Sequence, residues 1–511
     1  MASKKRQFAI NAASGLVDQA VRIGAGLVMV PYLMWRLGLD VYGISEIARS
    51  AVVFFGFLQL GMGPALVRFC SQAIAKNDQD EVHRVSSTAQ AILGVLGIVG
   101  MLGIVAFIPF FFMIYEVPEP QTFEVSMLLF CMAASLLLNF TAIVPQGLSL
   151  GCNRYDLVNM VGIVGSLLRL GLVVATFELF GPSLLFLGVS IFLVQLFRFV
   201  SLFAVAAIHV GRSAFPSFQS INKTTLRSLL GFSALNLISA MAGALVIQGP
   251  ILIVGKTLGN EMAALFAPVV LVATAMQGVL GQITSPLTPL ASQAQSENNP
   301  QKMGHWSIVT GGFVAAVGLA VALPLCVFGN EIISLWLGAN KAAYLWTAIA
   351  ATAVGTAISQ TATANSNLSL GGGCIRPVVY SQVVLGIAVF VGVAIGTGLL
   401  GWQLLGVVVF SVICRCLRSV LYLTYAYSKQ FFYSTSHYLW AVYVKSLLVF
   451  IGVLGGGFVI RRLVVPDRIV LLGIDVTITL VIYLIAIWYF VISIEIKKNI
   501  HKLIPGFRRS A

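Results

Sequence analysis

The sequence has few charged residues for its length. Of 511 residues only 9% are Asp, Glu, Lys or Arg, whereas 59% are hydrophobic. A soluble chain of this size needs far more polar surface to cover its core, so the composition excludes a soluble globular protein. Acidic residues are the scarcest, 17 against 31 Lys and Arg. The basic residues stand at the ends of apolar runs and do not form one face, which argues against a nucleic-acid partner.

Residue patterns that build catalytic or metal sites are also missing. The seven cysteines include no CxxC pair, and the five histidines show no HxxxH or HExxH spacing. We therefore predict neither a disulfide framework nor a metal site. Residues 249–257, GPILIVGKT, have five residues between the glycines where a phosphate-binding loop needs four. No predicted loop is long enough for a catalytic domain, so we predict a protein that is not an enzyme and has no cofactor.

Long apolar runs dominate what is present. A run of about 20 apolar residues is long enough to span a bilayer as a helix. Fourteen such runs occur, at 11–36, 45–67, 88–114, 123–148, 158–178, 184–208, 228–255, 263–288, 307–328, 345–369, 379–398, 403–427, 439–460 and 469–494. The predicted fold class is an all-α polytopic membrane protein.

Part of the chain is repeated at a nearly constant offset. Leu37-Gly38 recurs 221 residues later as Leu258-Gly259, and residues 148–151, LSLG, recur 220 residues later at 368–371. Internal duplication on this scale is typical of transporters. We predict two six-helix bundles followed by an unrepeated helix pair. The expected limits are 1–212 for the first bundle, 213–227 for a cytoplasmic linker, 228–428 for the second bundle, and 429–511 for the helix pair and a basic tail.

The Lys and Arg residues predict the orientation. Most of them, with Arg415 and Arg418 counted among the loop residues, fall on the side that carries both termini. By the positive-inside rule this side is cytoplasmic. Six helices separate the two copies, so both enter the membrane in the same sense. We expect a cavity between the halves near the bilayer midplane.

Ionisable side chains inside the apolar runs are the first candidates for a functional site, because burying one in hydrocarbon costs about 3 kcal/mol. On the first helix Asn11, Gly15, Asp18, Arg22 and Gly26 share one face, which predicts a polar stripe toward a wet interior. The basic residues within runs are Arg22, Arg49, Arg169, Arg198 and Lys445.

Two interpretations of the first pair stay open. Asp18 and Arg22 are four residues apart and can neutralise each other along the helix. Alternatively, Arg22 faces the cavity and binds an anionic group. Asp18 then either modulates the binding by Arg22 or carries a coupling proton. Arg49 can pair with Glu46 near the outer end of the second helix. The others, Arg169 and Arg198, are either structural ties within the first half or cavity residues.

The first helices of the second half offer amides in place of charges. Asn236, Gln248 and Gln277 are the candidates, and no charge lies between Arg227 and Lys256. We predict a cavity with one cationic and one amide-lined wall. Guanidinium groups bind phosphate bidentately and amides hydrogen-bond sugars, so such walls suit a substrate with a phosphate end and a hydroxyl-rich remainder.

Several motifs carry a family resemblance. Residues 31–33 (PYL), 36–38 (RLG), 61–63 (GMG) and 331–338 (EIISLWLG) are similar to elements of polysaccharide-exporting flippases in the multidrug/oligosaccharidyl-lipid/polysaccharide (MOP) superfamily. The resemblance implies two MATE-like six-helix bundles around a cavity that opens alternately to each side. It also implies transport of undecaprenyl-pyrophosphate-linked oligosaccharide for O-antigen or exopolysaccharide synthesis, with Arg22, and then Arg49, as the pyrophosphate ligands.

The resemblance also implies the surroundings of the protein. We expect a multi-pass protein of the bacterial cytoplasmic (inner) membrane, in contact with membrane lipids and with the polysaccharide polymerase or assembly machinery. The alternatives are an ion-coupled drug or small-molecule exporter of the same superfamily and a lipid II flippase. A membrane-bound glycosyl polymerase or ligase would need a large outer loop, which the sequence does not predict.

Overall fold

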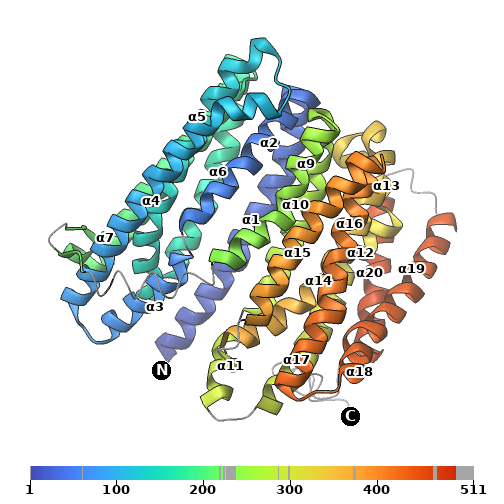
Figure 1. Ribbon diagram of the computed structural model, residues 1–511. Coiled ribbons are helices and arrows are strands. Elements are labelled where there is room, and N and C mark those ends of the chain that lie inside the picture. Colours follow the sequence, from blue (N-terminus) through green and yellow to red (C-terminus); the bar gives the residue numbers. More distant parts are fainter. Residues whose placement is uncertain are drawn as a thin grey trace. The chain divides into compact units, whose positions relative to one another are not determined.

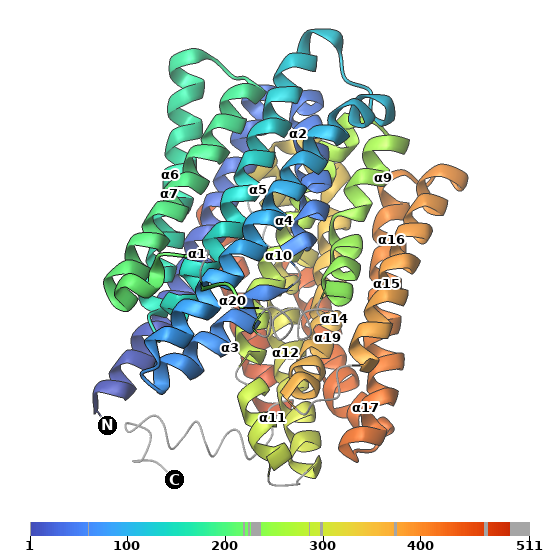
Figure 2. The same cartoon turned by 60° about the vertical axis from the view of Figure 1, so that its left-hand side comes forward.

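The computed structural model describes residues 2–59, 61–217, 220–222, 225, 237–285, 287–296, 300–371, 376–463 and 469–490, and within these ranges every regular element is a helix (Figures 1 and 2). Fourteen helical stretches in the described ranges are long and apolar enough to cross a membrane. Each of the fourteen predicted runs overlaps one of them, so the predicted all-α membrane fold is confirmed.

The chain packs as two compact units, residues 1–267 and 268–511. The boundary falls within one helix, later than the predicted linker at 213–227, because packing defines the units whereas the sequence repeat defined the predicted limits. Those predicted limits stay a proposal. The helices of the first unit are α1 (Ala2–Leu37), α2 (Leu39–Phe55), α3 (Met62–Ala75), α4 (Gln79–Ile114), α5 (Thr122–Gly151), α6 (Tyr155–Phe180), α7 (Leu184–Val210), α9 (Gly249–Thr257) and the start of α10 (Asn260–Thr284).

In the first unit five helices pack as successive neighbours. Helix α1 lies along α6, α6 along α7, α7 along α5, and α5 along α4 (Figure 2). A large hydrophobic cluster joins α3, α4 and α5, with Leu66, Leu93 and Phe140 fully buried. This cluster uses the apolar faces of α3 to α5, and leaves the polar face of α1 to pack on α6.

Glycines end the helices at the repeated positions. Gly38 follows α1 with φ 79°, and Gly259 follows α9 with φ 88°. Positive φ is easily adopted only by glycine, which explains why the Leu-Gly pair recurs at both positions. The second repeated motif also has one structural role, because 148–151 end α5 and 368–371 end α14 (Ala339–Gly371). The sequence repeat is therefore a repeat of helix ends.

The second membrane span is broken. Helix α2 passes at Phe55 into a short 3₁₀ turn, Gly56–Gln59, and α3 begins at Met62 after Gly61 with φ 63°. A left-handed residue cannot continue an α-helix, so α2 and α3 run in different directions.

The second unit contains the rest of α10, α11 (Leu287–Ser296), α12 (Pro300–Val327), α13 (Gly329–Leu337), α14, α15 (Arg376–Ala394), α16 (Gln403–Leu417), α17 (Thr424–Phe431), α18 (Thr435–Tyr438), α19 (Lys445–Leu463) and α20 (Ile469–Phe490). The π-helical stretches η5 (Ile395–Leu399), η6 (Arg418–Leu423) and η7 (Leu439–Val444) interrupt its spans. Helices α19 and α20 pack on α12, where Phe450 and Tyr483 join Leu319 in one buried cluster. The unrepeated helix pair is thus part of this unit's core.

Candidate functional site

The inner half of α1 is fixed to α6 by polar side chains. Asn11 donates from Nδ2 to the carbonyl of Asn153 at 3.1 Å, and its Oδ1 accepts from the backbone amide of Asp156 at 3.2 Å. One turn further, Asn159 Nδ2 donates to Ser14 Oγ at 2.9 Å. The first part of the predicted polar stripe therefore takes part in the contact between α1 and α6.

The same end of α6 is tied to α7. Arg154, just before α6, donates from Nε to Asp156 Oδ1 at 3.1 Å, and its Nη1 lies 2.6 Å from His209 Nε2 near the end of α7. The hydrogen bonds that Arg154 donates to Asp156, together with the negative charge of Asp156, raise the pKa of Arg154. These contacts fix where the next turns of α1, α6 and α7 meet.

Asp18 and Arg22 form the ion pair that their spacing predicts. The Asp18 side chain is only 10% exposed, whereas that of Arg22 is 59% exposed. Asp18 lies against Gly162 of α6, where an added Cβ would come within 2.5 Å of its Oδ1. The missing side chain of Gly162 leaves room for the carboxylate, and the guanidinium of Arg22 extends beyond it into open space.

A second arginine joins this pair from α7. Arg198 packs on Gly165, where an added Cβ would lie 3.3 Å from its Cδ, and its charge interacts with those of Arg22 and Asp18. Its Nε is buried and has no hydrogen-bond partner among the described residues. We call Asp18, Arg22 and Arg198 the inner cluster. It contains one carboxylate and two guanidinium groups.

A similar group lies further along α6. Arg49 donates from Nε to Glu46 Oε2 at 3.0 Å, and the side chain of Glu46 is 12% exposed. Arg169 of α6 interacts with the charges of both, and its buried Nε lacks a partner in the described part of the chain. We call these three residues the middle cluster. Arg49 lies ten residues after the start of α2 at Leu39.

The distance between the two clusters is set by residues of helix α6. Arg169 follows Gly162 by seven residues, which corresponds to roughly 10 Å along an α-helix. Together the clusters contain four arginines and two carboxylates, and so carry a net positive charge. Guanidinium groups left over after ion pairing are suited to a polyanion such as a pyrophosphate.

The predicted amide residues are placed differently from one another. Gln248 is buried in the first unit, where its Oε1 accepts a hydrogen bond from Ser50 Oγ at 3.0 Å. Gln277 lies half-buried on α10. Asn236 lies outside the described residues. The predicted amide-lined wall stays a prediction.

Two arginines of the second unit were misplaced by the sequence analysis. Arg415 and Arg418 were counted with the cytoplasmic loops, but both lie inside the span Gln403–Phe431. That placement is wrong, and the intramembrane basic residues therefore include Arg415 and Arg418. The signal was in the sequence, because the predicted run at 403–427 already encloses both residues.

The helix arrangement defines an all-α polytopic membrane protein, and comparisons with known proteins identify its family. Residues 9–295 match the family described as polysaccharide biosynthesis protein, and the chain belongs to this family. The comparison with curated protein sequences returned no match.

Solved structures of the MOP superfamily share the fold. A multidrug resistance MATE family transporter in the inward-facing conformation is 14% identical, with a TM-score of 0.67 over 82% of this chain and 98% of that one. The lipid II flippase MurJ is 12% identical, with a TM-score of 0.69 over 96% of this chain and 100% of that one. A MOP superfamily transporter from Pyrococcus furiosus is 14% identical, with a TM-score of 0.57 over 84% of this chain and 96% of that one. At these identities the likeness establishes the fold.

Proposed function

We propose that this protein is a flippase that moves undecaprenyl-pyrophosphate-linked oligosaccharide across the bacterial cytoplasmic membrane for O-antigen or exopolysaccharide synthesis. The observation that carries the proposal is the pair of arginine clusters in the first unit, each with one more guanidinium group than carboxylates. Family membership supports it, because the chain belongs to the polysaccharide biosynthesis proteins. The predicted cytoplasmic termini and contact with a polysaccharide polymerase belong to the same proposal.

The clusters give the proposed transport a sequence of steps. The exposed guanidinium of Arg22 first binds the pyrophosphate, with Arg198 beside it. The middle cluster, roughly 10 Å further along α6, then receives the same group through Arg49 and Arg169. Each carboxylate offsets one positive charge, which weakens binding enough to allow release. The polyprenyl chain stays in the lipid, where it costs no free energy of transfer.

The drug exporter is the weaker alternative, because clusters with net positive charge repel cationic drugs. The substrate of a lipid II flippase also carries a pyrophosphate, so a lipid II flippase would use the same two arginine clusters. The two lipid-linked substrates differ in their sugars, so the substrate must be identified by which precursor accumulates when the protein is removed.

The test is a deletion strain in which surface polysaccharide, radiolabelled lipid-linked precursors and drug susceptibility are measured together. We expect lost surface glycan and lipid-linked oligosaccharide retained on the cytoplasmic face, with unchanged drug susceptibility. Accumulated peptidoglycan precursor would replace the proposal with lipid II transport. Normal surface glycan together with new drug sensitivity would replace it with drug export.

A further inference from the structure

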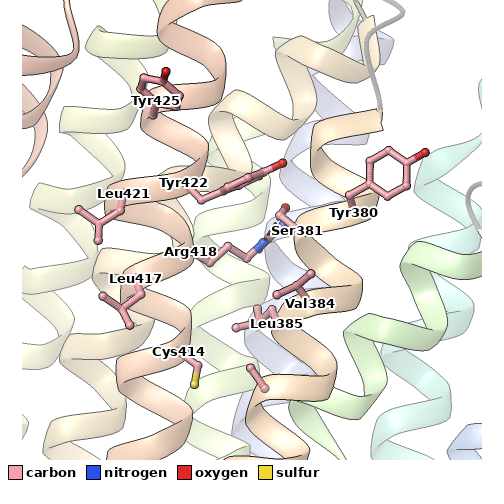
Figure 3. Close-up of a pocket in the computed structure, with 11 residues that line it drawn as sticks. Tyr380, Ser381, Val384, Leu385, Cys414, Leu417, Arg418, Leu421, Tyr422 and Tyr425 are labelled. Carbon is pink, nitrogen blue, oxygen red and sulfur yellow. Dashed lines mark hydrogen bonds between the residues drawn. The ribbon is translucent and has the colours of Figure 1, made fainter.

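A pocket of about 680 Å³ lies in the second unit between α15 and the continuous helix formed by α16, η6 and α17. Figure 3 shows its lining, with Tyr380, Ser381 and Val384 from α15 facing Leu417 and Arg418 from the other helix. Most of these side chains are apolar. The pocket is separate from both arginine clusters, which belong to the first unit.

Arg418 is the only charged residue that lines this pocket. Its Nε donates to Ser381 Oγ at 3.0 Å, and in Figure 3 the side chain reaches across toward α15. No carboxylate pairs with it among the residues that the structure describes. A cation inside a membrane span without an acidic partner is costly, and an anion supplied from outside the protein would offset that cost. The π-helical stretch η6 also begins at this residue, and such stretches are frequent at functional sites.

Helix α15 places Arg418 near one membrane surface. Ser381 follows Arg376, the first residue of α15, by five positions, or roughly 7 to 8 Å along the helix. On this side of Arg418 the pocket is lined by Tyr380, Tyr422 and Tyr425, each 46% to 65% exposed. Exposed tyrosines are enriched at the level of lipid headgroups.

The same end of the pocket carries a second positive charge. The Lys429 ammonium lies 4.6 Å from the centroid of the Tyr425 ring, one turn beyond the pocket residues. Away from this end the lining is aliphatic, and Val384 and Leu417 are each more than half exposed. The pocket therefore has a cationic, hydroxyl-bearing end and an apolar groove that runs toward the bilayer interior.

We propose that this pocket binds one anionic phospholipid from the leaflet at which α15 begins. The headgroup phosphate pairs with Arg418 and accepts hydrogen bonds from the Tyr380 and Tyr422 hydroxyls, and an acyl chain occupies the groove beside Val384 and Leu417. The charge on the lipid replaces the missing carboxylate, and the apolar wall accounts for the preference for a lipid over free phosphate. This site is independent of the substrate proposed above.

Native mass spectrometry of the purified full-length protein tests the proposal, with phosphatidylglycerol and phosphatidylcholine of identical acyl chains as probes. We expect wild type to retain phosphatidylglycerol preferentially, and Arg418→Gln to lower that retention about tenfold. Arg376→Gln is the matched control, because Arg376 is an exposed arginine at the start of α15, the facing helix, and does not line the pocket. Equal retention by wild type and Arg418→Gln would overturn the proposal.

A second measurement avoids the risk that the variant misfolds. Wild-type protein is photolabelled with phosphatidylglycerol that bears a diazirine on its acyl chain. The label is expected on peptides containing 384–388 or 414–421. Labelling elsewhere alone overturns the proposal, and so does displacement by equimolar polyprenyl phosphate, which would assign the pocket to the substrate carrier.

Discussion

The two units handle buried arginines in different ways. In the first unit Arg22 and Arg49 each have a carboxylate three or four residues earlier on their own helix, and a second arginine approaches from α6 or α7. In the second unit Arg418 has a serine hydroxyl as its partner and stands at the wall of an exposed apolar pocket. A local carboxylate lets a cation enter a helix bundle and stay there. Arg418 has no carboxylate partner among the described residues, on its own helix or on a neighbouring one, which separates a proposed transport site from a proposed lipid site.

Arg22→Ala gives the largest expected effect. It removes the exposed guanidinium of the inner cluster, and a charge-assisted hydrogen bond contributes about 1.5 to 3 kcal/mol, so we expect transport to fall at least about tenfold. Arg22→Lys should keep part of the activity because the charge remains. Surface glycan, normalised to membrane protein level, is the measurement.

The matched control for that variant is Arg84→Ala. Arg84 pairs with Glu81 at 2.8 Å on the first turns of α4, outside both clusters. The Arg84→Ala variant should export glycan at a level near that of the wild type. Equal export by Arg22→Ala and Arg84→Ala would remove the inner cluster from the transport path without affecting the fold.

Asp18→Asn separates neutralisation from proton coupling. Losing the carboxylate leaves Arg22 and Arg198 to repel each other, so we expect lower protein levels and weaker export. In the double variant Asp18→Asn/Arg22→Gln the protein level should recover while export stays lost, because the charges balance again. If Asp18→Asn keeps full export, the carboxylate has no role in neutralisation or in proton coupling.

Gly162→Ala tests the contact that places Asp18. The added methyl group would overlap Oδ1, and overpacking of this kind costs about 1 to 3 kcal/mol. We expect a lower melting temperature in detergent and a partial loss of export. Gly171→Ala on the same helix is the control, since an added Cβ there meets nothing within 4 Å. Similar melting temperatures for the two variants would contradict the described packing of Asp18.

Ser381→Ala gives the smallest expected effect. It removes the hydroxyl that orients Arg418 but leaves the charge, and a hydrogen bond of this kind contributes about 0.5 to 1.5 kcal/mol. Retention of phosphatidylglycerol should fall only about two- to tenfold and less than in Arg418→Gln. A loss as large as that of Arg418→Gln would mean that the hydroxyl, and not the charge, holds the lipid.

The sequence alone determined the number and position of the membrane spans, because hydropathy depends only on local composition. It also determined the ion pairs of Arg22 and Arg49, because their carboxylates lie one turn away on the same helix. The repeated Leu-Gly pair was visible in the sequence, but its role in ending helices was shown by the structure.

Tertiary structure alone decided which arginines meet. Arg198 joins Arg22, and Arg169 joins Arg49, through the packing of α1 on α6 and on α2 and of α6 on α7, and no local pattern records that packing. The same holds for Arg418, whose role follows from the hydroxyl opposite it on α15 and from the pocket between the two helices. A residue's burial cost is fixed by its chemistry, but its partner is fixed by which helices the packing brings together.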